Sequence, residues 1–167
     1  MAEDPQQHEL SREDAHPKAI EALTEAFFWD ANDLGSPLGG DTGHDVLEAL
    51  RDALETSPRG RVLPVLDEIL ARWEVANHSW DVVSEAEVQA IGEDDEFSLL
   101  TRDEAILALA FAQIVVEGRI DPEVRRRALL AVTRQNLPAL LHGWGDRRLE
   151  RALRLEKMRE ILARRWD

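Results

Sequence analysis

The sequence predicts an all-α protein, a single-domain bundle of about six to seven helices. Apolar residues recur every three or four positions through most of the chain, which is the spacing of one helix face. Glycine, proline and capping residues divide this pattern into segments of helical length. Aromatic residues make up only 5% of the chain, so the predicted core consists mainly of leucine, alanine, valine and isoleucine. At 167 residues the chain fits one domain with a substantial core.

The expected elements follow from the spacing of apolar and helix-breaking residues. Residues 1–15 are polar and acidic and are predicted to form a flexible N-terminus, and residues 16–167 are predicted to form the helical domain. The spacing predicts helices over residues 17–29, 45–55, 62–75, 84–91, 101–117, 122–135 and 146–166. Residues 79–83 are the only segment for which a short strand is expected.

Two of these helix starts are predicted from capping boxes. Ser84 with Glu87, and Thr101 with Glu104, have the three-residue spacing at which each partner satisfies a backbone amide of the other. The acidic run 93–96 lies between the two predicted helices. It is expected to form a solvated loop, because four consecutive carboxylates repel one another and favour water.

The C-terminal third begins at a clear helix break. Gly118 is expected to end one helix in a left-handed C-cap, and Asp121, which a proline follows, is expected to cap the next. Asp146 is expected to cap the last helix. In that helix Leu149 and Leu153 lie on a different side from the main apolar stripe, so its two halves are expected to contact different surroundings.

Composition excludes several classes of protein. The chain has no cysteine, which rules out disulfides, thiolate nucleophiles and cysteine-based zinc sites. The N-terminus lacks a secretory signal, and the longest apolar run, 105–116, is too short to span a bilayer of about 30 Å. A cytoplasmic protein without a membrane segment is therefore expected. The histidines and serines fit no zinc-protease or hydrolase motif, so the sequence favours a non-enzymatic protein and predicts no cofactor.

Charge is distributed unevenly along the chain. Residues 1–117 carry 27 acidic and 7 basic side chains, whereas residues 118–167 carry 7 acidic and 13 basic ones. Two interpretations stay open: the two parts attract each other within the fold, or one of them faces a partner of opposite charge. The candidates for a basic face are Arg125, Arg126, Arg127, Arg147 and Arg148. No aromatic platform accompanies them and the acidic part would repel nucleic acid, which argues against a nucleic-acid partner.

The segment 30–45 is the main candidate for a functional site, because it combines acidic residues with glycines directly before a helix. Carboxylates are ligands that Mg²⁺ and Ca²⁺ prefer, and the metal candidates are Asp30, Asp33, Asp41 and Asp45. The calcium-loop template fails, because Leu34 and Pro37 occupy positions that require other residues. The structural alternative makes Thr42 the N-cap of the helix, with Asp45 completing a capping box.

Seven residues in and beside this segment are the binding-loop candidates. They combine carboxylates, a hydroxyl, an aromatic anchor, an imidazole and a glycine: Trp29, Asp33, Gly39, Asp41, Thr42, His44 and Asp45. In the metal-dependent hypothesis His44, which lies beside two of the aspartates, would act as acid or base. In the structural alternative the same residues only close a tight connection.

The same segment resembles a known family. Phe28-Trp29, Asp33-Leu34 and the run 37–45, Pro-Leu-Gly-Gly-Asp-Thr-Gly-His-Asp, resemble the signature loop of the YfeS-like family of uncharacterised bacterial proteins. Residues 103–114 and 118–121 are similar to a second stretch of that family. Together these stretches cover about a third of the chain.

The loop departs from the family pattern at two positions. The usual order is Pro-Phe-Gly-Asn-Asp-Thr-Gly, and Leu38 and Gly40 stand here in place of the phenylalanine and the asparagine. The resemblance implies a bacterial cytosolic protein. It also supports the loop residues Gly39, Asp41, Thr42 and Asp45, and it implies no reaction.

These observations favour a small, acidic, cytosolic protein-binding module, in the form of a regulatory partner or of a toxin-neutralising immunity protein. The expected partner is another protein, and neither nucleic acid nor a membrane is expected. The first alternative is a metal-dependent enzyme or metal-binding protein that uses segment 30–45. The second alternative is nucleic-acid binding through the C-terminal arginines.

Overall fold

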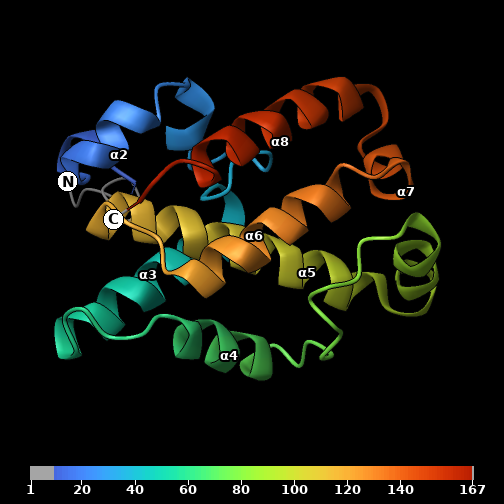
Figure 1. The fold of residues 1–167 in the computed structure, drawn as a ribbon, viewed down its shortest axis with the longest axis horizontal. Helices are drawn as coiled ribbons and strands as arrows, with labels where there is room; N and C mark the ends of the chain where they lie inside the picture. The colour runs from blue at the N-terminus through green and yellow to red at the C-terminus, as the bar shows by residue number, and fades with distance from the viewer. Residues whose placement is uncertain (1–9, 167) are drawn as a thin grey trace, which may run out of the picture.

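The computed structural model describes residues 10–166, and every regular element within them is a helix (Figure 1). The α-helices are α2 (Pro17–Ala22), α3 (Gly40–Thr56), α4 (Leu63–Arg72), α5 (Glu85–Glu117), α6 (Pro122–Gln135), α7 (Pro138–Leu141) and α8 (Arg148–Leu162). Short 3-10 turns are η1 (Arg12–Asp14), η2 (Ala26–Trp29) and η3 (His142–Arg147). The predicted all-α class is confirmed. Of the predicted flexible segment 1–15, residues 1–9 lie outside the described residues, and Leu10 is buried in the core.

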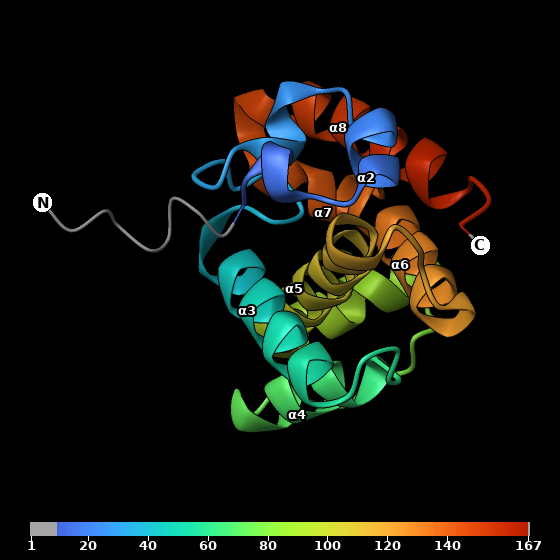
Figure 2. The same ribbon diagram turned by 90° about the vertical axis from the view of Figure 1, so that its left-hand side faces the viewer.

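Helix α5 forms the centre of the fold. Figure 2 shows it nearly end-on, with α3 on one side, α6 on the other, α4 below and α2 and α8 above. Between residues 102 and 115 only Glu104 is exposed, because the helix is surrounded by partners and its sequence is apolar on all sides. Within residues 10–166 no helix has the length and apolarity needed to cross a membrane.

A kink divides α5 into a first segment (85–94) and a second segment (96–117). Asp95 has non-helical dihedral angles, φ −152° and ψ 74°, and its Oδ1 accepts a hydrogen bond of 3.1 Å from the amide of Ser98. Asp95 is thus the N-cap of the second segment. The predicted capping box at Thr101 is wrong because Thr101 lies inside the helix, and a kink replaces the predicted loop at 93–96. Ser84 does cap the first segment, since its Oγ accepts from the amide three residues later.

The predicted strand at 79–83 is wrong. These residues form an irregular connection, and two of its carbonyl groups accept hydrogen bonds from an arginine side chain. Arg134 Nη1 donates to the carbonyls of Trp80 and Val82, at 2.6 and 3.0 Å. The guanidinium of Arg102 lies 4.5 Å over the ring centre of Trp80. Charged donors therefore stabilise irregular backbone here without a sheet.

A fully buried ion pair holds Arg134 in place. The side chains of Asp103 in α5 and Arg134 in α6 are both 0% exposed, and Arg134 Nη2 lies 2.9 Å from Asp103 Oδ1. Arg134 Nε reaches both carboxylate oxygens at 3.2 Å. Asp103 Oδ2 also accepts a 2.9 Å hydrogen bond from the side-chain amide of Gln135. The carboxylate is therefore paired with a charge and saturated with donors, as a buried charge requires.

The first predicted helix, 17–29, is divided in the structure. Helix α2 ends at Ala22, because Leu23 leaves the helical region (φ −91°, ψ 74°) and a 3-10 turn follows. The indole Nε1 of Trp29 donates to the carbonyl of Leu23 at 2.8 Å. The turn thereby points Phe28 into the core, where it stacks on Phe111 at 5.5 Å.

Helix α3 begins five residues earlier than the predicted helix 45–55, at Gly40. Thr42 is therefore not an N-cap, and Asp45 does not complete a capping box, because both residues lie inside the helix. The early start is possible because Gly43 has no side chain. A Cβ atom at that position would lie 2.4 Å from the carbonyl carbon of Leu38, where the preceding loop crosses the helix.

The C-terminal third matches the sequence prediction most closely. Gly118 ends α5 with φ 68° and ψ 26°, and α6 spans the predicted residues 122–135. Asp121 makes no side-chain cap bond, because its carboxylate pairs with Arg119 at 2.9 Å. Helix α8 starts at Arg148 and ends at Leu162, so it does not extend from the predicted Asp146 cap to residue 166. Leu149 and Leu153 are exposed, while the main stripe is buried.

The close crossing at Gly43 gives a stability prediction. Replacement by alanine forces its methyl group against the backbone of Leu38, which cannot move aside as a flexible side chain would. We expect Gly43→Ala to lower the free energy of unfolding by about 1–3 kcal/mol, the usual cost of overpacking. Gly143→Ala is the matched control, because a Cβ there meets no atom within 4 Å. Urea denaturation of both variants checks the prediction, and equal midpoints would contradict it.

Candidate functional site

The segment 30–45 forms one wall of a cleft. Figure 2 shows the chain between η2 and α3 running from the layer of α2 and α8 down to the start of α3. The cleft has a volume of about 290 Å³, and α5, η3 and α8 complete its lining. The lining residues are Leu34, Ser36, Pro37, Gly39, Gly40, Asp41, Thr42, Gly43, Glu104, Leu107, Trp144, Arg151 and Met158. The cleft thus joins the predicted loop to the basic C-terminal part of the chain.

Asp33 fastens the loop to α8. Its Oδ2 lies 2.7 Å from Arg154 Nη1, and Arg147 Nη2 lies 3.9 Å from its Oδ1. The same Oδ1 accepts a 2.8 Å hydrogen bond from the amide of Gly35. Burial alone would raise the pKa of Asp33, but the Gly35 amide and the two arginines outweigh burial and lower it. Asp33 is therefore a charged structural anchor between the acidic and basic parts.

The other predicted metal ligands do not gather around Asp33. Asp30 accepts a 3.0 Å hydrogen bond from the amide of Asn32, and Asp41 and Asp45 are exposed on α3. Nowhere in residues 10–166 do three His, Cys, Asp or Glu side chains lie close enough to hold a metal ion. The metal-dependent hypothesis thus has no support from the described geometry.

The glycines of the loop permit close backbone contacts. A Cβ on Gly39 would lie 1.9 Å from the carbonyl oxygen of Asp33. Gly40 has φ 74° and donates its amide to the carbonyl of Ala31 at 3.0 Å. Glycine and, among other residues, asparagine tolerate this left-handed conformation best. An asparagine at this position would therefore also suit the backbone conformation that Gly40 adopts here.

Three polar groups of the cleft were not predicted as site residues. Glu104 is exposed toward the cleft, and the partial burial of its carboxyl there raises its pKa; nearby Arg151 and a hydrogen bond with the Thr42 hydroxyl oppose that rise. Arg151 is 6% exposed, and burial lowers its pKa to about 10. Its guanidinium lies 4.6 Å over the Trp144 ring. The third group is Ser36, which is 5% exposed.

The sequence signal for these groups was weak. Glu104 is the one exposed position in an otherwise buried helical stretch, but its spacing from Thr101 imitates a capping box. Arg151 lies among many arginines, and only the tertiary structure shows that it is buried while its neighbour Arg148 is exposed. Of the remaining candidates, Trp29 packs against the core, and the buried Nε2 of His44 has no hydrogen-bond partner among the described residues.

The candidate basic face is largely paired inside the molecule. Arg125 donates to the carbonyls of residues 162 and 163 at the end of α8, at 2.6 and 2.8 Å. Arg126 bridges Glu123 and Asp81, at 2.9 and 2.6 Å. Hydrogen bonds from Arg126, and from Arg127 beside it, lower the pKa of Glu123 to about 2. Internal attraction therefore accounts for these three arginines.

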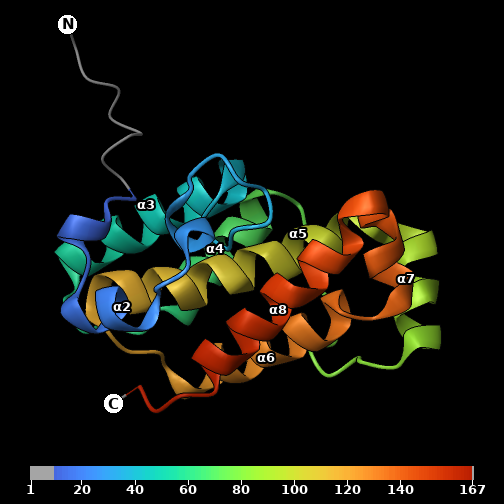
Figure 3. The same cartoon turned by 90° about the horizontal axis from the view of Figure 1, so that it is seen from above.

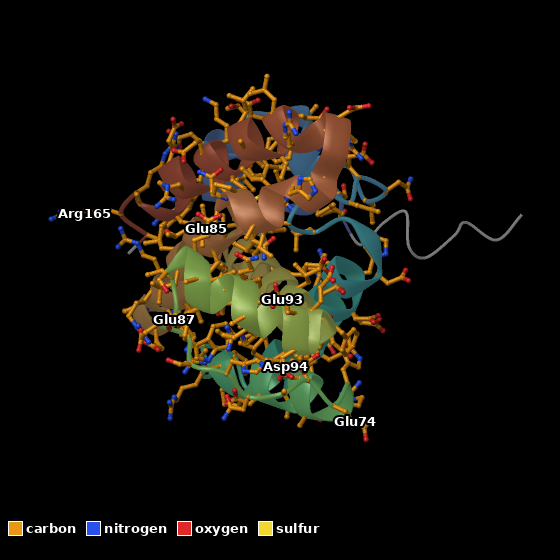
Figure 4. All side chains as sticks on the ribbon, turned by 90° about the vertical axis from the view of Figure 1, so that its right-hand side faces the viewer. Glu74, Glu85, Glu87, Glu93, Asp94 and Arg165 are labelled. Atoms are coloured by element: carbon orange, nitrogen blue, oxygen red, sulfur yellow. The ribbon has the colours of Figure 1, made fainter. Side chains whose placement is uncertain are left out.

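The opposite situation holds at the first segment of α5. Four exposed carboxylates lie there and a fifth follows the kink, and we call these five the acidic end: Glu85, Glu87, Glu93, Asp94 and Glu96. Figure 4 labels four of them on the segment that crosses the end of the bundle, and Figure 3 shows that α7 lies at the same end. None of the five forms an ion pair within the described part of the chain. Phe97, directly after them, is 61% exposed.

The fold belongs to the class of all-α proteins, with one buried helix at the centre. The chain is 29% identical over 133 residues to the uncharacterised protein YfeS of Escherichia coli (strain K12), which covers 79% of this chain and 54% of that protein. The similarity supports the YfeS-like family that the loop residues indicated. The chain spans about half the length of the curated relative it matches. No protein-family model and no solved structure matches it.

The anchor at Asp33 predicts a pH-dependent stability. The pKa of its carboxyl is lower in the folded protein than the ordinary value of 3.8, so its stabilising effect is present above that value and is lost as the pH falls below it. We expect Asp33→Asn to cost about 1–2 kcal/mol of unfolding free energy at neutral pH, because asparagine can still accept from Gly35 but does not attract Arg154.

Urea denaturation from neutral pH down to about pH 3 measures this difference. The gap between wild type and Asp33→Asn should shrink as the pH falls. Asp30→Asn is the matched control, because Asp30 has no arginine partner among the described residues and asparagine keeps its acceptor. A gap of constant size at every pH would show that Asp33 does not act through its charge.

Proposed function

We propose that the protein is a non-enzymatic binding module of the cytoplasm that docks a basic partner protein through the acidic end. The distribution of unpaired charge carries this proposal. Arg125, Arg126 and Arg127 bind carboxylates and carbonyls within the molecule. The carboxylates of the acidic end have no cationic partner in residues 10–166, and Glu93 accepts only a 3.4 Å hydrogen bond from the side chain of Gln89. The partner therefore meets a negative surface and not a basic one.

The carboxylates of the acidic end repel one another, and no nearby cation in the described residues offsets this repulsion. Glu93 and Asp94 lie at the C-terminal end of the first segment of α5, where the helix dipole is negative. Residues 40–97 carry fifteen acidic and four basic side chains, so their surroundings do not compensate the repulsion. A cationic partner would relieve it, and the same field would accelerate the encounter.

Apolar side chains beside the carboxylates supply the contact area that charge alone lacks. Phe97 is 61% exposed and Val83 is 37% exposed. Only Val88 of the first segment is fully buried, so that helix packs weakly on the rest of the fold. An exposed aromatic anchor with a charged rim is typical of a protein interface.

Matched charge variants test the proposal. The variant E85Q/E87Q/E93Q/D94N neutralises four carboxylates of the acidic end. The control D45N/E48Q/D52N/E55Q removes the same charge from the exposed side of α3. In affinity capture at low salt we expect the wild type and the control to retain the same basic protein, and the first variant to lose it. Calorimetry with that purified protein should show an affinity that falls at least about tenfold in the first variant and declines with salt.

Two results would overturn this function. One is that the wild type retains no basic protein at low ionic strength. The other is that both variants lose the partner equally, which would indicate a general charge effect. Gene order then separates the two forms of the module: an immunity protein is expected next to a toxin gene, whereas a regulatory partner is expected beside the gene of the protein it controls.

A further inference from the structure

The cleft described above contains polar groups that the fold leaves unpaired. Arg151 is 94% buried and its Nε has no hydrogen-bond partner in the described structure. Ser36 is 95% buried, and its Oγ has no partner there either. Unpaired buried polar groups are costly and rare in folded proteins. Both line the same cleft, Ser36 from the loop and Arg151 from α8.

We propose that this cleft binds a small carboxylate that carries a hydrogen-bond donor on the neighbouring atom, as α-amino and α-hydroxy acids do. The site is separate from the acidic end and does not depend on the function proposed there. Ser36 and Arg151 supply two donors for the carboxylate. Arg151 is held by the Gly35 carbonyl, at 3.4 Å, and by the Trp144 ring, so it is positioned before the ligand arrives.

The start of α3 supplies the rest of the anion site. The first amides of a helix have no partner within the helix and lie at the positive end of its dipole. Helix α3 has 17 residues, and the amide of Gly40 already donates a hydrogen bond to the carbonyl of Ala31. The next two residues, Asp41 and Thr42, line the cleft. Their amides, together with Arg151 and Ser36, form a site for a negatively charged group.

Glu104 explains why the ligand should carry a donor as well. Its carboxylate lines the cleft, and it interacts electrostatically with Arg151 without a direct ion pair of 4 Å or less in the described residues. A ligand placed between them can give its carboxylate to Arg151 and its ammonium or hydroxyl group to Glu104. Arg151 is the one cationic side chain in the lining, and Asp41 adds a further negative charge. This balance disfavours multiply charged phosphates.

The size and the apolar part of the cleft limit the ligand further. A volume of about 290 Å³ lies at the low end of ligand sites, which range from roughly 300 to 1,000 Å³. Leu34, Leu107 and Met158 provide apolar lining next to the polar groups. A ligand with a short aliphatic side chain therefore fits better than a nucleotide or a cofactor.

Amide NMR titration of the full chain tests the proposal directly. The probes are L-leucine, L-2-hydroxyisocaproate, 4-methylpentanoate, leucinamide and inorganic phosphate. We expect the first two to bind at millimolar concentration and to shift the amides of Asp41 and Thr42. 4-Methylpentanoate, which lacks the donor, and leucinamide, which lacks the carboxylate, should each bind at least about tenfold more weakly.

Variants separate the site from unspecific binding. Arg151→Met and Ser36→Ala should weaken leucine binding, the first by at least about tenfold. Arg148→Met on the same helix is the matched control, because Arg148 is exposed and does not line the cleft. Ser36→Ala keeps the test valid if Arg151→Met fails to fold. No shift with either acid, a preference for phosphate, or equal affinities for wild type and Ser36→Ala would overturn the assignment.

Discussion

The buried pair of Asp103 and Arg134 is the interaction on which the rest of the fold depends. It joins the central helix α5 to α6 with both side chains fully excluded from solvent. Such a pair is stabilising only if every donor and acceptor is satisfied. Here the side chain of Gln135 donates a further hydrogen bond to the carboxylate, and the guanidinium donates to the carbonyls of residues 80 and 82. The pair therefore also fixes the irregular chain between α4 and α5.

The same principle explains the uneven charge of the sequence. Basic side chains of the C-terminal part bind acidic groups far away along the chain, as Arg154 binds Asp33 across 121 positions. Most of the described arginines of α6 are used in this way, so they are part of the architecture. Much of the acidic surplus makes no ion pair in residues 10–166: at the acidic end these carboxylates lie beside the exposed Phe97, and others lie on the exposed side of α3. The carboxylates that make no ion pair within the described residues are therefore the groups available to bind a partner.

Local chemistry made some elements predictable from the sequence. Gly118 and the proline at position 122 define a helix end and a helix start that the structure confirms. A run of apolar residues identified the central helix, because only a buried helix can be apolar on every side. These features depend on a few neighbouring residues, and neighbouring residues are what a single sequence shows.

The errors came from contacts between distant residues. Thr42 and Thr101 have the residue types of N-caps, but long-range packing places both inside helices. The strand expected at 79–83 is absent, because Arg134 of α6 donates to two of its carbonyl groups where a neighbouring strand would have done so. The cleft was half predicted: the loop residues were identified, but Glu104 and Arg151 were not, since their position opposite the loop follows only from the packing of α5 and α8.

A double-mutant cycle on Asp103 and Arg134 tests this account most directly. The variants Asp103→Asn, Arg134→Met and the double variant would be compared by urea denaturation. Each single change should cost about 3 kcal/mol or more, because it leaves a buried charge without its partner. The double variant should lose much less than the sum, with a coupling energy of at least about 2 kcal/mol. Costs that add to within about 0.5 kcal/mol would contradict the account, because the two residues would then act independently.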